Sequence, residues 1–163
     1  MANEVEKVTK ETVEKGGVLA LLYFDLHGKD KSKLSELGVG FVNQVLKEPG
    51  VVFALGEINE PEERNDMFST SLQLKVLCKS FLSITNLCEK YSPFSLEILK
   101  PDKLVFTIDS AQELLMNIST TTFEYKKHII EKLSSPEELE GYRSALANKL
   151  EMGKKLFQKG EKK

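Results

Sequence analysis

The chain has 163 residues, 29% of them charged, and a formal net charge of -2, which suits one globular domain of ordinary size. This balance supplies no overall field to attract nucleic acid or an anionic membrane, so neither is an expected partner. No run approaches the roughly 18 apolar residues of a membrane span, and the N-terminus MANEVEKVTKETVEK lacks the apolar segment of a signal peptide. We expect a soluble, cytoplasmic single domain over residues 1–163, with polar tails at 1–15 and 159–163.

The first predicted strand is the most hydrophobic run of the chain, VLALLYFDLH at 18–27, which glycines bound on both sides. A helix is predicted over 30–47, because apolar residues recur there at helical spacing before Pro49 and Gly50 stop it. Gly38 and Gly40 lie in this helix without the spacing of a phosphate-binding loop. They either thin the helix for close packing on the sheet or mark a break in it.

Alternating apolar residues predict three more strands, VVFALGEIN at 51–59, FSTSLQLKVLC at 68–78 and FSLEILK at 94–100. The second and third strands form a hairpin across NEPEERNDM, and a helix over 80–91 precedes the fourth. This β-α-β-β-α-β order over 18–100 resembles the ferredoxin-like split βαβ arrangement, which implies a four-stranded antiparallel sheet with two helices on one face. The resemblance is to a fold and carries no functional residues with it.

A predicted core follows from the shared periodicity of these elements. Its members are Ala20, Leu22, Phe24, Leu26, Phe41, Val45, Leu72, Leu74, Val76, Phe81, Ile84, Leu87, Leu96 and Ile98. Cys78 and Cys88 fall in apolar segments without the paired spacing of a zinc site or a redox motif, and are expected to be buried, reduced thiols.

Two amphipathic helices are predicted at the C-terminal end, over 109–133 with Asp109 as N-cap and over 136–158 after Ser135. Their apolar stripes comprise Leu114, Leu115, Ile118, Tyr125, Ile129 and Leu133, then Leu139, Tyr142, Leu146, Leu150 and Phe157. Such an αα-hairpin must cover an apolar surface. It either folds over the open face of its own sheet or pairs with a second chain, and we favour a homodimer.

The candidate site lies on the face of the sheet opposite the core. Alternation along the first strand directs Tyr23, Asp25 and His27 to that face, and the antiparallel third strand brings Ser69 or Ser71 beside Asp25. The predicted ligand-binding residues are Tyr23, Asp25, His27, Ser71, Gln73, Lys75 and Glu97, with Glu57 close by.

Three interpretations of this cluster remain open. A carboxylate beside an imidazole fixes its tautomer and raises its basicity, so Asp25, His27, Glu57 and Lys75 would be the catalytic candidates of an acid-base or hydrolytic enzyme. The cluster could instead bind a small ligand without catalysis, with Lys75 stabilising an anion. A strand end with cross-strand ion pairs would carry the same residue types.

No cofactor or metal is expected, because metal sites need three or four ligands at a defined geometry. The second histidine, His128, is surrounded by lysines, and the acidic loop GEINEPEERND, which ends at Asp66, lacks the spacing of a calcium loop. We therefore expect a non-catalytic module for small-ligand binding, regulation or oligomerisation, with the enzyme as the alternative.

Overall fold

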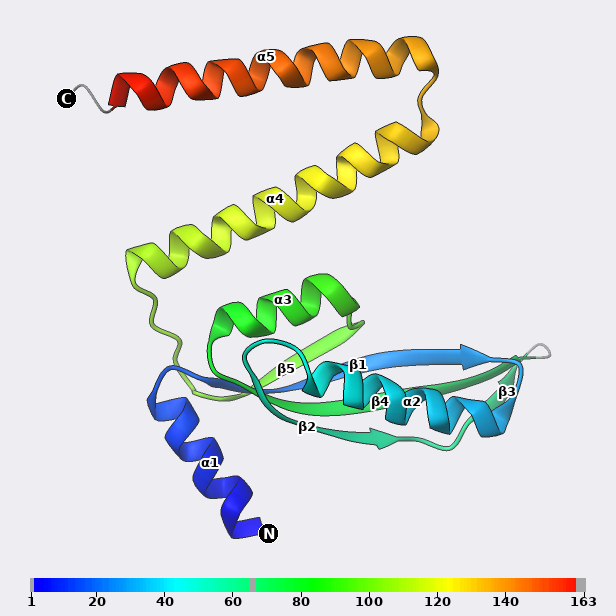
Figure 1. The fold of residues 1–163 in the computed structure, drawn as a ribbon. Coiled ribbons are helices and arrows are strands. Elements are labelled where there is room, and N and C mark those ends of the chain that lie inside the picture. Colours follow the sequence, from blue (N-terminus) through cyan, green and yellow to red (C-terminus); the bar gives the residue numbers. More distant parts are fainter. Residues whose placement is uncertain (1, 65–66, 161–163) are drawn as a thin grey trace. The chain divides into compact units, whose positions relative to one another are not determined.

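Figure 1 shows the computed structural model, which describes the backbone of residues 2–64 and 67–160 and the side chains of residues 4–63 and 67–152. Asp66 and the side chain of Phe157, both considered above, lie outside the described residues. The chain divides into two compact units, residues 1–114 and 115–163. Among the described helices, none is long and apolar enough to cross a membrane.

The first unit is built on an antiparallel sheet of five strands. They are β1 (Val18–Gly28), β2 (Val51–Ile58), β3 (Glu62–Arg64), β4 (Met67–Cys78) and β5 (Ser95–Lys100). The strand order is β2-β4-β1-β5, and β3 pairs with β4 beyond the end of β2. Strand β3 was not predicted from the sequence, because its three residues are all charged and give no alternation of apolar and polar positions.

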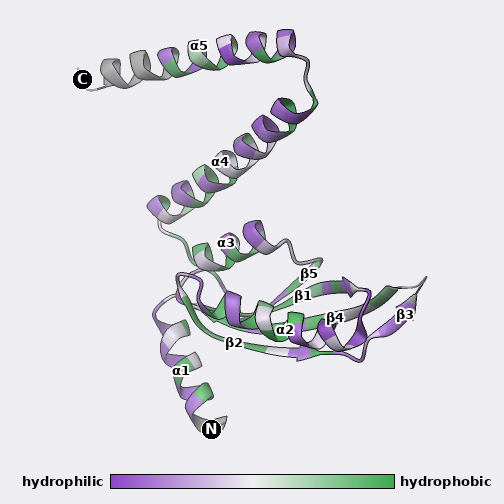
Figure 2. Ribbon diagram, turned by 45° about the vertical axis from the view of Figure 1, so that its right-hand side comes forward, coloured by the Kyte–Doolittle hydropathy of each residue, from purple (hydrophilic) through white to green (hydrophobic). Residues whose placement is uncertain are grey.

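Five helices complete the described chain. They are α1 (Ala2–Glu14), α2 (Lys31–Leu46), α3 (Phe81–Tyr91), α4 (Ile108–Leu133) and α5 (Pro136–Gly160). The prediction of a mixed α+β chain that ends in two helices is therefore confirmed. In Figure 2, α4 and the coloured part of α5 show hydrophobic and hydrophilic residues interspersed along the helix.

Helix α1 occupies the segment that the sequence analysis treats as a polar tail. Val5, Thr9 and Val13 are spaced four residues apart and face the sheet, where Thr9 is buried. Glutamates and lysines on the other positions of the helix conceal this stripe from a composition argument. The helix ends in a turn at Gly16, whose φ of 93° favours glycine.

The two C-terminal helices differ in how well their first residues were predicted. The hydroxyl of Thr107 accepts a hydrogen bond from the backbone amide of Ser110 at 3.2 Å, so Thr107 rather than Asp109 caps α4. Ser135 caps α5 as predicted, since its hydroxyl accepts from the amide of Glu138 at 3.4 Å. The Glu138 carboxylate accepts from the amide of Ser135 at 2.9 Å, which completes a capping box.

The core lies between one face of the sheet and helices α2 and α3. Ten of the predicted core residues are buried, namely Ala20, Leu22, Phe24, Leu26, Val45, Leu72, Leu74, Val76, Ile84 and Leu87. Phe41, Phe81 and Ile98 pack against this cluster while partly exposed. Leu96 is 40% exposed, because β5 is an edge strand. On the opposite face of the sheet, α1 covers one end. The other end carries polar residues such as Asp25 and His27.

Candidate functional site

The strand register sets out the open face of the sheet in rows. Asp25 of β1 lies opposite Ser71 of β4, and His27 lies opposite Ser69. Asp25 and His27 are both exposed, whereas Leu22, Phe24 and Leu26 between and before them are buried. The alternation that directs apolar side chains into the core therefore places carboxylate, imidazole and hydroxyl groups together on the opposite side.

These residues line a cleft of about 620 Å³, which we call the hairpin-end cleft. Its polar lining comprises Asp25, His27, Asn59, Glu60, Glu62, Ser69, Thr70 and Ser71. The wall nearest β2 is fixed by Asn59, whose side-chain amide donates to the Ser71 hydroxyl at 2.7 Å. The Asn59 carbonyl accepts from the Thr70 hydroxyl at 2.6 Å, so the loop after β2 is held against β4.

The charges of the hairpin-end cleft are predominantly negative. Asp25, Glu60 and Glu62 contribute carboxylates, and no lysine or arginine is among the described residues that line it. Within the described chain, no group of three or more His, Cys, Asp and Glu side chains has the arrangement of a metal site. The cleft is thus an acidic, hydroxyl-rich surface suited to a polar ligand that donates hydrogen bonds.

The other predicted site residues are distributed over neighbouring rows. Tyr23 lies opposite Gln73, and Gln73 lies opposite Glu57 in β2, one row away from Asp25. Lys75 lines a separate cleft beneath α1. Glu97 lies on the edge strand β5 and lines neither cleft. The structure therefore brings together Asp25, His27 and Ser71 but separates them from Lys75 and Glu97.

Several residues of this region were not found from the sequence. Asn59, Glu60 and Glu62 line the cleft because β2 ends and β3 begins there, and pairing the two predicted strands residue by residue would have placed Asn59 beside Ser71. Phe94 also lies on this face, where its ring is 6.2 Å from that of Tyr23. Its amide donates to the Tyr23 carbonyl at 2.9 Å, a contact that alternation does not reveal.

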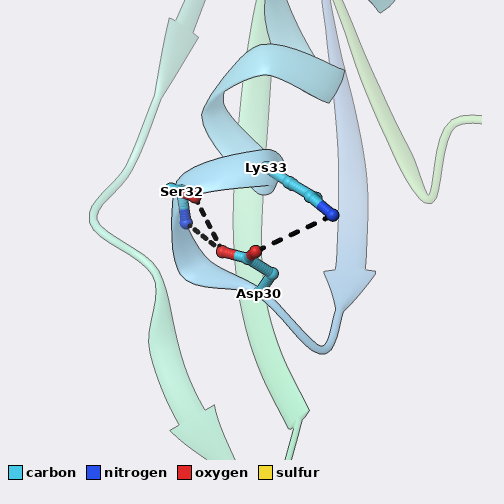
Figure 3. A network of polar contacts seen from close by, with 3 residues as sticks. All are labelled: Asp30, Ser32 and Lys33. Carbon is cyan, nitrogen blue, oxygen red and sulfur yellow. Dashed lines mark hydrogen bonds and ion pairs between the residues drawn. The ribbon is translucent and has the colours of Figure 1, made fainter.

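The charged segment after His27 has a structural explanation. Asp30 caps α2: its carboxylate accepts from the amide of Ser32 at 2.9 Å and from the hydroxyl of Ser32 at 2.7 Å. Figure 3 shows these contacts together with Lys33, whose ammonium lies 4.0 Å from the same carboxylate. The hydrogen bonds from Ser32 lower the pKa of Asp30. Asp30 is thus committed to starting the helix rather than to the cleft.

The two cysteines do not line the hairpin-end cleft, and their thiols are in an unreactive form. Both are free thiols, with Cys78 buried and Cys88 partly buried. Burial raises the pKa of Cys78 to about 12 and also raises that of Cys88. At neutral pH both therefore remain protonated, a form that is a poor nucleophile.

An α+β domain with an acidic cleft at the hairpin end of its sheet is the class of protein that the fold and the site define. The chain belongs to the MJ0538 family, whose model matches residues 19–149. The matched segment contains β1 from its second residue, the other four strands, α2, α3, α4 and the first part of α5, but not α1. No curated protein and no solved structure matches the chain.

Proposed function

We propose that this protein is a non-catalytic binding module that holds a small, positively charged polar ligand in the hairpin-end cleft. The observation that carries the proposal is the composition of the cleft: carboxylates from Asp25, Glu60 and Glu62 surround hydroxyls and an amide without a lysine or arginine among the described lining residues. Its volume of about 620 Å³ lies in the range of small-molecule sites, roughly 300–1,000 Å³. An organic ammonium group would be attracted by the carboxylates of Asp25 and Glu60, which line the cleft.

A pair of probes of equal length and opposite charge tests this proposal. We expect 1,4-diaminobutane to bind and succinate not to bind in isothermal titration calorimetry, because only the diamine complements the carboxylates. Asp25→Asn should weaken diamine binding by about two- to fivefold, the range expected for removing one exposed charge. Glu97→Gln is the matched control, since Glu97 lies on the same sheet outside the cleft. Equal binding of both probes, or equal loss in both variants, would refute the assignment.

The alternative is an enzyme that uses Asp25, His27, Glu57 and Lys75. Its support is that Asp25 and His27 line one cleft. Lys75 lines the other cleft and Glu57 lies in the neighbouring row, so the four groups do not converge. We expect no hydrolysis of p-nitrophenyl acetate above the level of His27→Ala. Turnover that disappears in this variant, with the fold intact, would favour the enzyme.

The C-terminal helices support a second role, self-association. No residue of α4 is buried, although its apolar side chains include Leu115, Ile118 and Leu133, which are 66%, 47% and 80% exposed. The family match extends through α4, so the exposed stripe belongs to the segment that defines the family. We propose a homodimer in which these helices form an αα-hairpin and contribute the interface.

Two further interpretations accompany this proposal. We interpret residues 18–100 as a ferredoxin-like core, supported by the element order β1-α2-β2-β4-α3-β5 and by antiparallel pairing of neighbouring strands. We also propose a cytoplasmic location, supported by two cysteines that are both free thiols.

A further inference from the structure

A second cleft lies beneath helix α1, at the opposite end of the open sheet face from Asp25 and His27. Its volume is about 470 Å³, and we call it the α1 cleft. Residues of α1 form one wall, while the other walls come from β1, β2, β4 and β5. Both walls belong to the first compact unit. The sheet wall lies within the segment that the family model matches, whereas α1 lies outside it.

The inner surface of the α1 cleft is apolar. Leu19 of β1 and Phe53 of β2 form the sheet side, and Val5 and Val13 of α1 lie across from them. Leu19 is 8% exposed and Val5 is 39% exposed, so the cleft deepens from Val5 towards Leu19. A hydrocarbon group that displaces water from these side chains would be stabilised in proportion to the apolar area that it buries.

Two lysines of the sheet lie beside this apolar surface and carry positive charge. Lys75 of β4 and Lys100 of β5 both line the cleft. The register irregularity between Leu19 and Ala20 pairs Lys100 with Leu19, which turns the lysine towards the same side as the leucine. Neither lysine takes part in an ion pair within the described residues.

The strand neighbours of Lys75 carry no opposite charge. The residues directly opposite Lys75 are Leu21 on β1 and Leu55 on β2, so no carboxylate faces it across a strand pair. Glu97 is one strand further away in that row. Lys10 of α1 also lines the cleft, but unlike Lys75 it has carboxylates close by. Glu6 and Glu14 lie one helical turn before and after Lys10 and offset its charge.

We propose that the α1 cleft binds a free amphipathic carboxylate, with its hydrocarbon chain between α1 and the sheet and its anionic end at Lys75 and Lys100. An apolar cavity with a few convergent charged groups has the composition of a small-ligand site. A membrane surface fits less well, since both lysines lie on the sheet wall of a cleft beneath α1, where the carboxylate of a free molecule can reach them but an extended flat surface cannot. This site is separate from the hairpin-end cleft, and the proposal does not depend on that function.

The test compares octanoate with octylammonium, which shares the hydrocarbon chain, and with acetate, which shares the carboxylate. In titration calorimetry of the full chain we expect saturable binding of octanoate, and no saturable binding of octylammonium or acetate. Lys75→Gln combined with Lys100→Gln should weaken octanoate binding by about five- to tenfold, as expected for two solvent-accessible charges. Lys79→Gln is the matched control, because Lys79 directly follows β4 and does not line the cleft.

A second variant tests the position of the hydrocarbon chain. Val5→Trp places a larger ring at the mouth of the cleft on a partly exposed helix position, so it should block octanoate without disturbing the core. Asp25→Asn should leave octanoate binding unchanged. The proposal would be overturned if the unmodified protein showed no saturable binding of octanoate. It would also be overturned if binding persisted in both Val5→Trp and the double variant Lys75→Gln with Lys100→Gln. A preference for phosphatidylglycerol vesicles over free octanoate would overturn it as well.

Discussion

At the scale of single residues, Glu48 links the turn after α2 to the end of α3. Its carboxylate accepts a hydrogen bond from the Lys90 ammonium at 2.6 Å and another from the Tyr91 hydroxyl. The Tyr91 ring packs edge-on against Phe41 at 5.2 Å between centroids, and Phe41 contacts Phe24 at 4.8 Å. One carboxylate thus anchors an aromatic series that reaches the buried face of β1.

This arrangement predicts a stability that depends on pH. The hydrogen bonds from Lys90 and Tyr91 lower the pKa of Glu48 from its ordinary value of 4.5. Its contribution is therefore fully present above that pH and is lost as pH falls through the lower folded pKa. We expect Glu48→Gln to unfold at lower denaturant concentration than the unmodified protein at pH 7, and the difference to shrink under acidic conditions.

Urea unfolding of both proteins across the acidic range measures this difference. Glu36→Gln is the control, because Glu36 is an exposed residue of α2. A gap between Glu48→Gln and the unmodified protein that stays constant with pH would show that the charge of Glu48 is not the cause. The hydrogen bond to Glu48 raises the pKa of Lys90 above its ordinary value of 10.5. Lys90 therefore loses its proton only at strongly alkaline pH, outside the range of this experiment.

Residue types and alternation were sufficient to predict part of the site. Asp25 and His27 could be assigned to the open face because Leu22, Phe24 and Leu26 had to be buried together. The register alone separates Lys75 from Asp25, since Lys75 lies opposite Leu21 and Asp25 lies opposite Ser71. That Lys75 lines a second cleft could not be predicted, since this depends on where α1 crosses the face. The acidic nature of the cleft depends on Glu60, in the loop after β2, and on Glu62, the first residue of β3, and the path of this segment carries no signal in the sequence.

At the scale of elements, Gly38 and Gly40 of α2 differ in their surroundings, which decides whether each thins the helix for packing or marks a break in it. A Cβ on Gly38 would lie 2.4 Å from Cδ1 of Ile58 and 3.4 Å from Cδ1 of Leu26. Gly40 has no atom within 4 Å of the same position. Gly38 is buried and Gly40 is exposed, so only Gly38 thins the helix for contact with the sheet. Neither breaks it, since α2 is continuous.

The two glycines provide a matched pair of substitutions. Gly40→Ala should stabilise the protein by about 0.5–1 kcal/mol, because alanine favours a helix interior over glycine. Gly38→Ala has the same helix preference but must displace Ile58, and overpacking of this kind costs about 1–3 kcal/mol. We expect it to destabilise the protein in urea unfolding. Equal stabilisation by both substitutions would show that the contact between α2 and β2 is not tight.

The elements differ in how far the sequence predicts them. In β1 from residue 20 to 28 and in β4 from residue 70 to 76, buried residues alternate with partly buried or exposed ones, and this pattern leaves little choice of register. Strand β3 exists only because it pairs with β4, and its own residues carry no such pattern. Helix α1 combines a short apolar stripe with many charges, and its packing on Leu19 and Phe53 is a tertiary effect.

At the scale of the whole molecule, the first unit has a self-contained core, whereas α4 has no buried residue. An amphipathic helix of 26 residues extends about 39 Å at 1.5 Å per residue. Exposing its apolar stripe to water is unfavourable in proportion to the area exposed. Pairing two copies around a two-fold axis buries equivalent stripes against each other and leaves no further surface unpaired.

A single charge on the stripe of α4 tests this pairing. Ile118→Glu should shift the protein from dimer to monomer in sedimentation equilibrium at micromolar concentration, because the buried carboxylate would lack a partner. Thr120→Glu adds the same charge about 200° further around the helix, at about 100° per residue, and should remain dimeric. Circular dichroism of both variants verifies that the helices persist.

Deletion of residues 136–163 separates the contributions of the two helices. If α4 and α5 form one interface, the shortened protein should dissociate while the core of β1 to β5 stays folded. A monomeric unmodified protein would refute the homodimer and return the apolar stripe of α4 to an intramolecular role, as a cover for the open face of its own sheet. In that case Ile118→Glu should lower the midpoint of urea unfolding, and the oligomeric state should not change.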